Sequence, residues 1–175
     1  MPRLRVSMSN PDSTDLQRAE ADYQALIEAH QTLLLSTVTA DGQPEISYAP
    51  YVRDQAGRFY IFVSELAGHT RNLQQQGWAA ILFIRAEAES RNPFARERLV
   101  LKCRADELSR SDPDYGEMLA RLEQRFGDTV ALLKGLPDFH LFVLTPTAGH
   151  YVVGFGKTYQ LELPAGRLSP VLPPG

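Results

Sequence analysis

A polar segment in the first half of the chain carries the residue types that bind phosphate. A strand-like run ends at Ser64 and leads through Gly68 and His69 to Thr70 and Arg71, where a short helix is predicted to begin. A helix start offers N–H groups without backbone partners, and hydroxyl groups and a guanidinium add charge-assisted hydrogen bonds. Arg71 alone would fit an ordinary solvated charge. Together with its neighbours it predicts an anion site.

Other residues with reactive side chains fit structural roles better. Cys103 is the single cysteine, which excludes an intrachain disulfide, and its strand-like surroundings indicate an inert core thiol. His140 and His150 alternate with apolar residues and lack the helical His–Glu spacing of a zinc site, so no metal ligands are predicted. Gly154-Phe155-Gly156-Lys157 matches neither a dinucleotide fingerprint nor a P-loop, and is interpreted as a strand bend where a ligand can approach.

The elements that must position these residues are mainly strands. An Asp-Gly turn at residues 41–42 separates the runs 33–39 and 44–52, and a strand over 58–64 continues the meander. The other predicted elements are a helix from residue 12 to His30, a short helix over 71–76, a strand covered on both faces over 78–84, a connection over 85–95, a strand over 96–108, helices over 109–126 and 128–134, and strands over 138–145 and 150–163 joined by a turn.

This order predicts an α+β fold: a six- to seven-stranded antiparallel split β-barrel, closed or nearly closed, with flanking helices. Residues 1–175 are expected to form a single domain, with irregular tails at 1–11 and at the Pro-rich segment 164–175.

Composition narrows the possible partners. The chain has 175 residues and a formal net charge of −3, so it has no basic field for nucleic acid or an anionic membrane. No apolar run reaches 18 residues and the N-terminal segment lacks an apolar signal core. A cytoplasmic protein without nucleic-acid or membrane partners is the expectation.

Several motifs resemble one known superfamily. The matching segments are Thr37 to Pro44, Ser47 to Tyr51, and Ser64 with His69 to Leu73. They are similar to the FMN-binding split-barrel superfamily typified by pyridoxamine 5′-phosphate oxidase. Phe94 to Leu99 and Gly154 to Lys157 resemble its haem-utilisation branch, whose members bind or degrade haem. The resemblance implies a homodimer that holds FMN in a groove between protomers.

The resemblance also implies a set of cofactor-binding residues. The second strand would lie beside the isoalloxazine ring, while the helix start would hold the phosphate. The implied set is Ser47, Tyr48, Ala49, Ser64, His69, Thr70 and Arg71, with help from Arg98 or Lys157. His69 also fits a surface position. The oxidase has basic phosphate partners on its second strand, where this chain has Ser, Tyr and Ala, so neutralisation would depend mainly on Arg71.

The resulting expectation is an FMN-binding flavoprotein, an oxidoreductase acting at a homodimer interface, with its catalytic residues unidentified. The alternatives are a haem-binding or haem-degrading protein and a non-catalytic ligand-binding dimer. The resemblance implies that haem-degrading members bind iron through a C-terminal histidine supported by an acidic residue of the partner subunit. Asp138 matches the acidic position, but no histidine follows Gly154. Weak or heterogeneous haemin binding without conversion to biliverdin is therefore expected.

Overall fold

The structure is a computed structural model that describes residues 13–154 and 156–171. The predicted N-terminal tail 1–11, the expected helix cap at Asp12, and Phe155 lie outside these described residues. The described chain divides into two compact units. The first unit comprises segments 1–30, 83–100 and 148–175, and the second comprises 31–82 and 101–147. Since both units contain early and late segments, neither is a simple half of the sequence.

The strands form one antiparallel system that does not close among the described residues. Its main path has the order β2-β1-β5-β6-β7-β4-β3, and β8 extends it by pairing with β7 and β9. The strands are β1 Thr32–Val38, β2 Pro44–Pro50, β3 Val52–Arg53, β4 Phe59–Ser64, β5 Trp78–Ile84, β6 Arg98–Leu108, β7 Phe139–Gly154, β8 Lys157–Glu162 and β9 Arg167–Pro170. The predicted α+β class and antiparallel split barrel with flanking helices are confirmed. The predicted closure of the barrel is wrong, and nine described strands replace six or seven.

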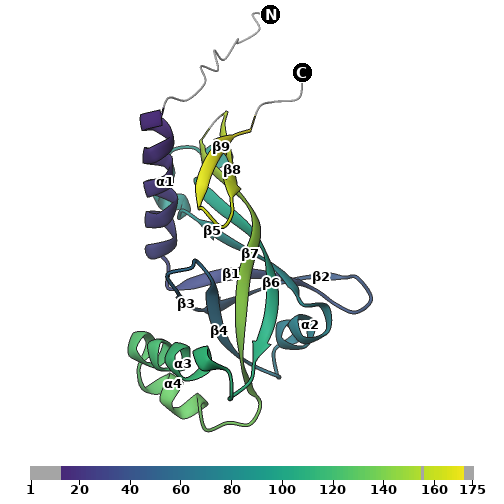
Figure 1. The fold of residues 1–175 in the computed structure, drawn as a ribbon. Helices are drawn as coiled ribbons and strands as arrows, with labels where there is room; N and C mark the ends of the chain where they lie inside the picture. Colours follow the sequence, from purple (N-terminus) through teal and green to yellow (C-terminus); the bar gives the residue numbers. More distant parts are fainter. Residues whose placement is uncertain (1–12, 155, 172–175) are drawn as a thin grey trace, which may run out of the picture. The chain divides into compact units, whose positions relative to one another are not determined.

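The second unit contains the β1–β2 hairpin and three helices (Figure 1). The helices are α2 Gly68–Gln76, α3 Pro113–Phe126 and α4 Asp128–Leu133. Gly42 takes φ +87° in the predicted Asp-Gly turn, and the Thr39 N–H donates to the Gln43 carbonyl at 2.9 Å across it. Helix α2 lies against β1 and ends at Gly77, whose φ of 67° is the left-handed conformation that glycine accepts without strain.

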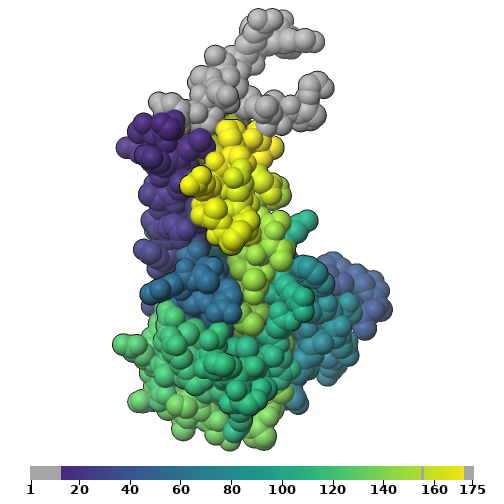
Figure 2. Space-filling view, in the orientation of Figure 1, coloured from purple at the N-terminus to yellow at the C-terminus, as the bar shows by residue number. Residues whose placement is uncertain are grey.

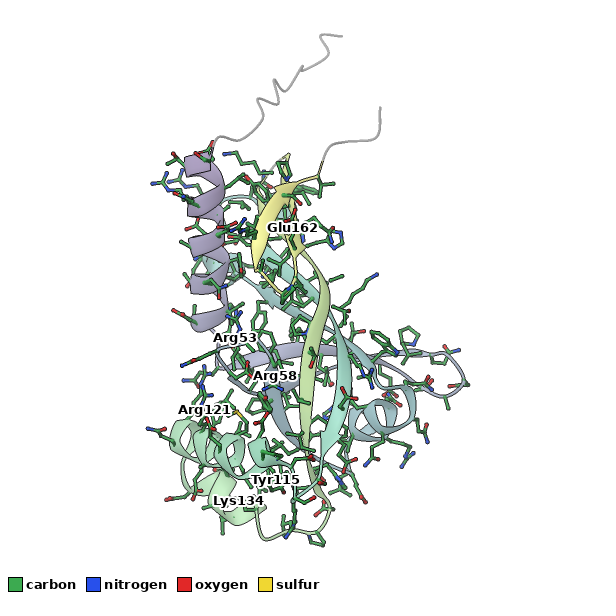
Figure 3. The ribbon with its side chains drawn as sticks, in the orientation of Figure 1. Arg53, Arg58, Tyr115, Arg121, Lys134 and Glu162 are labelled. Atoms are coloured by element: carbon green, nitrogen blue, oxygen red, sulfur yellow. The ribbon has the colours of Figure 1, made fainter. Side chains whose placement is uncertain are left out.

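Helices α3 and α4 cover an apolar cluster on β4 in the same unit. Met118 and Leu122 of α3 pack with Tyr60 and Leu141 in this cluster. Polar contacts fix α3 to the β3–β4 hairpin: the Nη2 of Arg58, a side chain labelled in Figure 3, donates to Asp114 Oδ2 at 3.0 Å.

The first unit is built on α1, Ser13–Glu28, which lies beside β8 and β9 (purple and yellow in Figure 2). The Tyr23 hydroxyl donates to the Gly166 carbonyl at 2.7 Å, so it ties α1 to the turn before β9. Of the six residues predicted to lie on one apolar stripe, Ala19, Tyr23, Leu26 and Ile27 are buried, whereas Leu16 and His30 are half-buried. The short 3₁₀ helices Glu87–Glu89 and Pro93–Ala95 form the polar connection between β5 and β6.

Three details of the predicted elements are wrong. The predicted turn at 146–149 is part of β7. Pro146 is tolerated there because the β4 register ends at Leu144 and the β8 register begins at Gly149, so neither of these two strands needs the N–H that proline lacks. The tail predicted to be irregular contains β9, which pairs with β8. Strand β5 alternates rather than being covered on both faces, and its Trp78 is 57% exposed.

Two further differences are small. Helix α2 begins at Gly68, three residues before the predicted Arg71. Gly154 and Lys157, the ends of the segment predicted as a strand bend, pair with each other where β7 and β8 meet, and Gly156 takes φ +68°. No helix of the described chain combines the length and apolar character needed to cross a membrane.

Candidate functional site

The second unit has an open groove of about 770 Å³ between β2 and the start of α2, here called the β2–α2 groove. Its lining residues are Glu45, Ile46, Ser47, Tyr48, Ala67, Gly68 and His69. The two walls therefore come from the second strand and from the helix start, which are the two segments that the sequence marked as cofactor-binding.

An apolar strand face borders this groove. Register places Leu34 opposite Tyr48 and Ser36 opposite Ile46, and alternate residues of a strand share a face. We define the apolar face by its exposed large side chains: Leu34, Val38, Ile46, Tyr48 and Trp78, the last on β5. Ile46 is 81% exposed and Tyr48 64%, which is unusual for neighbouring large apolar groups. Such a face suits a flat apolar ligand, a partner chain, or both.

The three predicted residues of β2 do not all reach the groove in the same way. Tyr48 belongs to the apolar face, whereas Ala49 is buried at 1% exposure on the opposite side of the strand. Ser47 is half-buried, and its hydroxyl donates to the Leu35 carbonyl at 3.4 Å. Side-chain contact between β2 and a ligand on the apolar face would therefore depend on Ile46 and Tyr48.

The predicted phosphate residues lie close in sequence and space, but their hydroxyls already have partners. Ser64 Oγ donates to Asp138 Oδ2 at 2.7 Å and accepts the Leu66 N–H at 3.1 Å. Thr70 is fully buried and its Oγ1 donates to the Ser64 carbonyl at 2.5 Å. Of the three predicted phosphate residues near the helix start, Arg71 alone is exposed. The phosphate assignment remains a prediction.

A carboxylate occupies the helix start. A Cβ atom added at Gly68 would lie 2.9 Å from Glu45 Oε2, so the carboxylate end of this flexible side chain packs closely against the start of α2. The Asn72 Nδ2 donates to the same oxygen at 2.8 Å and to Thr37 Oγ1 at 3.0 Å. Asn72 and Thr37 are 4% and 1% exposed, so a buried pair holds the carboxylate in place.

His69 lines the groove and is half-buried. Burial lowers its pKa below the ordinary value, although the nearby Glu45 charge acts in the opposite direction. Its Nε2 is buried and has no hydrogen-bond partner within the described part of the chain. The ring is therefore favoured in the neutral form, which can bind a metal ion.

The remaining predicted residues, Arg98 and Lys157, belong to the first unit. Arg98 Nη1 donates to the Arg96 carbonyl at 3.0 Å, and Lys157 is exposed at the start of β8. Their roles remain predictions. Cys103 is fully buried as predicted, and burial raises its thiol pKa to about 12, which makes it unreactive.

Sequence reasoning missed Glu45 and Asn72. Glu45 follows a proline in an alternating strand, where a carboxylate reads as an ordinary solvent-facing residue. Asn72 lies 27 positions away, so only the packing of α2 against β1 could pair the two residues. No local sequence signal predicts this contact.

Comparison with known proteins agrees with the architecture. The family model of pyridoxamine 5′-phosphate oxidase matches residues 19–153. The chain is 37% identical over 145 residues to the protein named haem oxygenase HutZ of Vibrio cholerae serotype O1, covering 83% of this chain and 82% of that protein.

Two solved structures give the same result. The crystal structure of HutZ from Vibrio cholerae, there called the haem storage protein, has a TM-score of 0.71 and 33% identity, covering 77% of this chain and 94% of that one. The structure of Campylobacter jejuni ChuZ has a TM-score of 0.78 and 27% identity, covering 95% of this chain and 65% of that one. The family match across residues 19–153 shows that this chain belongs to the pyridoxamine 5′-phosphate oxidase family.

Proposed function

We propose that this chain is a haem-binding protein whose macrocycle site is the β2–α2 groove with the adjoining apolar face. The observation that carries the proposal is the exposed apolar surface around Ile46 and Tyr48, which a flat tetrapyrrole would cover. The 37% identity to a protein named haem oxygenase supports it. Arg71, exposed on α2 two residues after the groove residue His69, supplies a cation suited to a haem propionate.

The groove also offers one imidazole. All four histidines lie within the described residues, and His69 is the one that lines the groove. His140 is held between Glu65 and Glu107, and His150 is exposed in the first unit. We assign the iron-facing role to His69, whose Nε2 would have to turn from its buried position. Bound haem would supply a redox-active iron; the protein's part is binding and orientation.

FMN is the second candidate, because the family resemblance implies it. The predicted FMN-dependent oxidoreductase activity receives no support beyond family membership, whereas the haem alternative has a named relative. The homodimer that would complete such a site remains part of the proposal.

Haem binding can be tested by titrating haemin and following the Soret band in wild type and in Ile46→Asp. Burying an isoleucine side chain is worth about 1.5–3 kcal/mol, so we expect a charge there to raise Kd about tenfold or more. Leu132→Asp is the matched control, because Leu132 is 76% exposed on α4, outside the groove lining. Equal affinity of Ile46→Asp and wild type would overturn the placement of haem on this face.

A further inference from the structure

The start of α2 is where the family resemblance places the phosphate of FMN. Its three predicted ligands are Ser64, Thr70 and Arg71. A phosphate needs free hydrogen-bond donors, since its oxygens only accept unless protonated. The Thr70 hydroxyl is buried and donates to the Ser64 carbonyl, while the Ser64 hydroxyl donates to Asp138. Two of the three side chains would have to release existing partners before they could bind phosphate.

The second observation is the position of Glu45. Its Oε2 lies so near Gly68 that any Cβ there would be 2.9 Å away. A hydrogen bond holds this side chain in place: Asn72, which is itself only 4% exposed, donates from Nδ2 to Glu45 Oε2 at 2.8 Å. Since the N-terminus of a helix carries a partial positive charge, it stabilises this carboxylate as it would stabilise an external anion. The chain thus supplies its own anion to the helix start.

The negative charges near the start of α2 then distinguish a ligand with a phosphate from one without. A phosphate monoester carries close to two negative charges at neutral pH, and here it would face the carboxylates of Glu45 and Asp138. Arg71 is the one exposed cation among the three predicted phosphate ligands near the helix start. Repulsion between the phosphate and these two carboxylates would weaken the binding of FMN, whereas a flavin without a phosphate would not be repelled.

We propose that Glu45, together with Asp138, closes the phosphate cradle of this family member and thereby excludes FMN. The residues present do not fit the phosphate group, and the disagreement identifies specificity-determining residues. This proposal concerns only the exclusion of FMN, so the outcome of its test does not depend on whether the chain binds haem.

The test compares FMN with riboflavin, which has the same ring but no phosphate. Affinity is measured by quenching of flavin fluorescence on the full chain for wild type, Glu45→Gln, Asp138→Asn and the double variant. Gln preserves the acceptor for Asn72 and removes only the charge. Asp41→Asn is the matched control, because it neutralises an exposed carboxylate in the turn of the same hairpin. Urea unfolding confirms that each variant is folded.

We expect Glu45→Gln to tighten FMN binding at least tenfold relative to riboflavin, and the double variant to tighten it further. The control should leave the FMN-to-riboflavin ratio within twofold of wild type. If wild type shows no measurable flavin binding, FMN binding by the double variant supports the proposal. A folded double variant that still binds no FMN, an unchanged ratio, or a wild type that already prefers FMN tenfold would each overturn it.

Discussion

At the residue scale, the first unit is organised around a buried carboxylate. Glu97 is 9% exposed and its Oε1 accepts a hydrogen bond of 2.5 Å from the hydroxyl of Tyr151, which is fully buried. Arg85 Nε donates to the other oxygen at 2.6 Å. Burial and the hydrogen bond to Glu97 both raise the pKa of Tyr151, so its hydroxyl stays a donor over the whole working range.

Removing this donor should be costly. We expect Tyr151→Phe to lower the free energy of unfolding by about 1.5–3 kcal/mol, since the bond involves a charged group that stays buried. Tyr159→Phe is the control: this ring stacks on Tyr151 at 6.5 Å between centroids and is 5% exposed. Urea denaturation followed by circular dichroism should show a change within about 0.5 kcal/mol for the control. Equal losses would mean that the Glu97 contact contributes nothing specific.

His69 is the residue that most directly reports the proposed haem site. Because burial lowers its pKa, the imidazole is neutral at neutral pH, and it could bind iron once its buried Nε2 turns toward the groove. We expect His69→Ala to shift the Soret maximum of the haemin complex and to weaken binding about tenfold. The His150→Ala variant, altered at an exposed histidine of the first unit, should keep the wild-type spectrum. An unchanged spectrum in His69→Ala would remove this residue from the site.

Contacts between individual side chains are the feature that the sequence predicts least well. It found the helix start around Thr70 because glycine, hydroxyl and guanidinium groups are contiguous there. It could not find Glu45, since a carboxylate on an alternating strand has no feature that distinguishes a docked side chain from a solvated one. Side-chain partners separated by 27 positions, as Asn72 and Glu45 are, depend on tertiary packing.

At the element scale, one histidine joins three strand ends. His140 on β7 lies opposite Val63 of β4, and its two ring nitrogens face Glu107 Oε1 at 2.6 Å and Glu65 Oε1 at 2.8 Å. Burial of the ring opposes protonation, but the hydrogen bonds and charges of the two glutamates outweigh it and raise the pKa of His140 above 6.5. The folded state therefore binds this proton more tightly than the unfolded chain.

This linkage predicts the sign of a pH effect. The contribution of His140 is complete below the unfolded pKa of 6.5 and is lost as pH rises through the higher folded-state value. We expect His140→Gln to destabilise the fold by about 1 kcal/mol near pH 5.5, because both glutamates are partly exposed, and by clearly less near pH 9. Urea unfolding of His140→Gln and the exposed-site control His150→Gln at both pH values measures this. A cost that grows with pH would contradict the assignment.

Elements were predicted well wherever turn chemistry was strong. The Asp-Gly turn at residues 41–42 and the helix end at Gly77 lie where expected, because positive φ is required at both glycines. A turn was predicted at Pro146 because proline usually marks a turn. The residue is tolerated in β7 because neither β4 nor β8 pairs with the strand at this point. Strand β9 was missed because its pairing with β8 is non-local information about a Pro-rich segment.

At the scale of the whole molecule, the apolar face demands an explanation beyond one chain. Leu34, Val38, Ile46, Tyr48 and Trp78 are all at least 40% exposed. A face of this kind marks an interaction surface. Haem can cover part of it, and a second copy would cover the rest, as the family resemblance implies.

We expect a homodimer in solution. Light scattering should give a mass about twice the 19.6 kDa of one chain at micromolar concentration. Trp78→Asp, at a side chain that is 57% exposed, should shift the mass toward a single chain, because a buried charge at an interface lacks compensation. Leu132→Asp on α4 should leave the mass unchanged. A wild-type mass near 20 kDa would show that the apolar face has no partner copy.

The fold class followed from the sequence because local hairpins and helix signals are consistent along the chain. The family followed from motifs such as the His69–Leu73 segment, which periodicity alone would not identify. The choice of cofactor did not follow, since the same barrel can hold different ligands and the distinction rests on individual side chains. In this chain the distinguishing side chains are Glu45 at the start of α2 and the exposed residues of the apolar face.

We propose that this chain binds haem and rejects FMN. The most direct measurement is to incubate the purified chain with haemin or with FMN in equal excess, desalt both samples, and record their visible spectra. We expect a retained Soret band with up to one haem per chain, in place of the weak haemin binding expected from the sequence alone, and no retained flavin absorbance at about 450 nm. Retention of FMN with loss of haemin would contradict the account and restore the flavin interpretation.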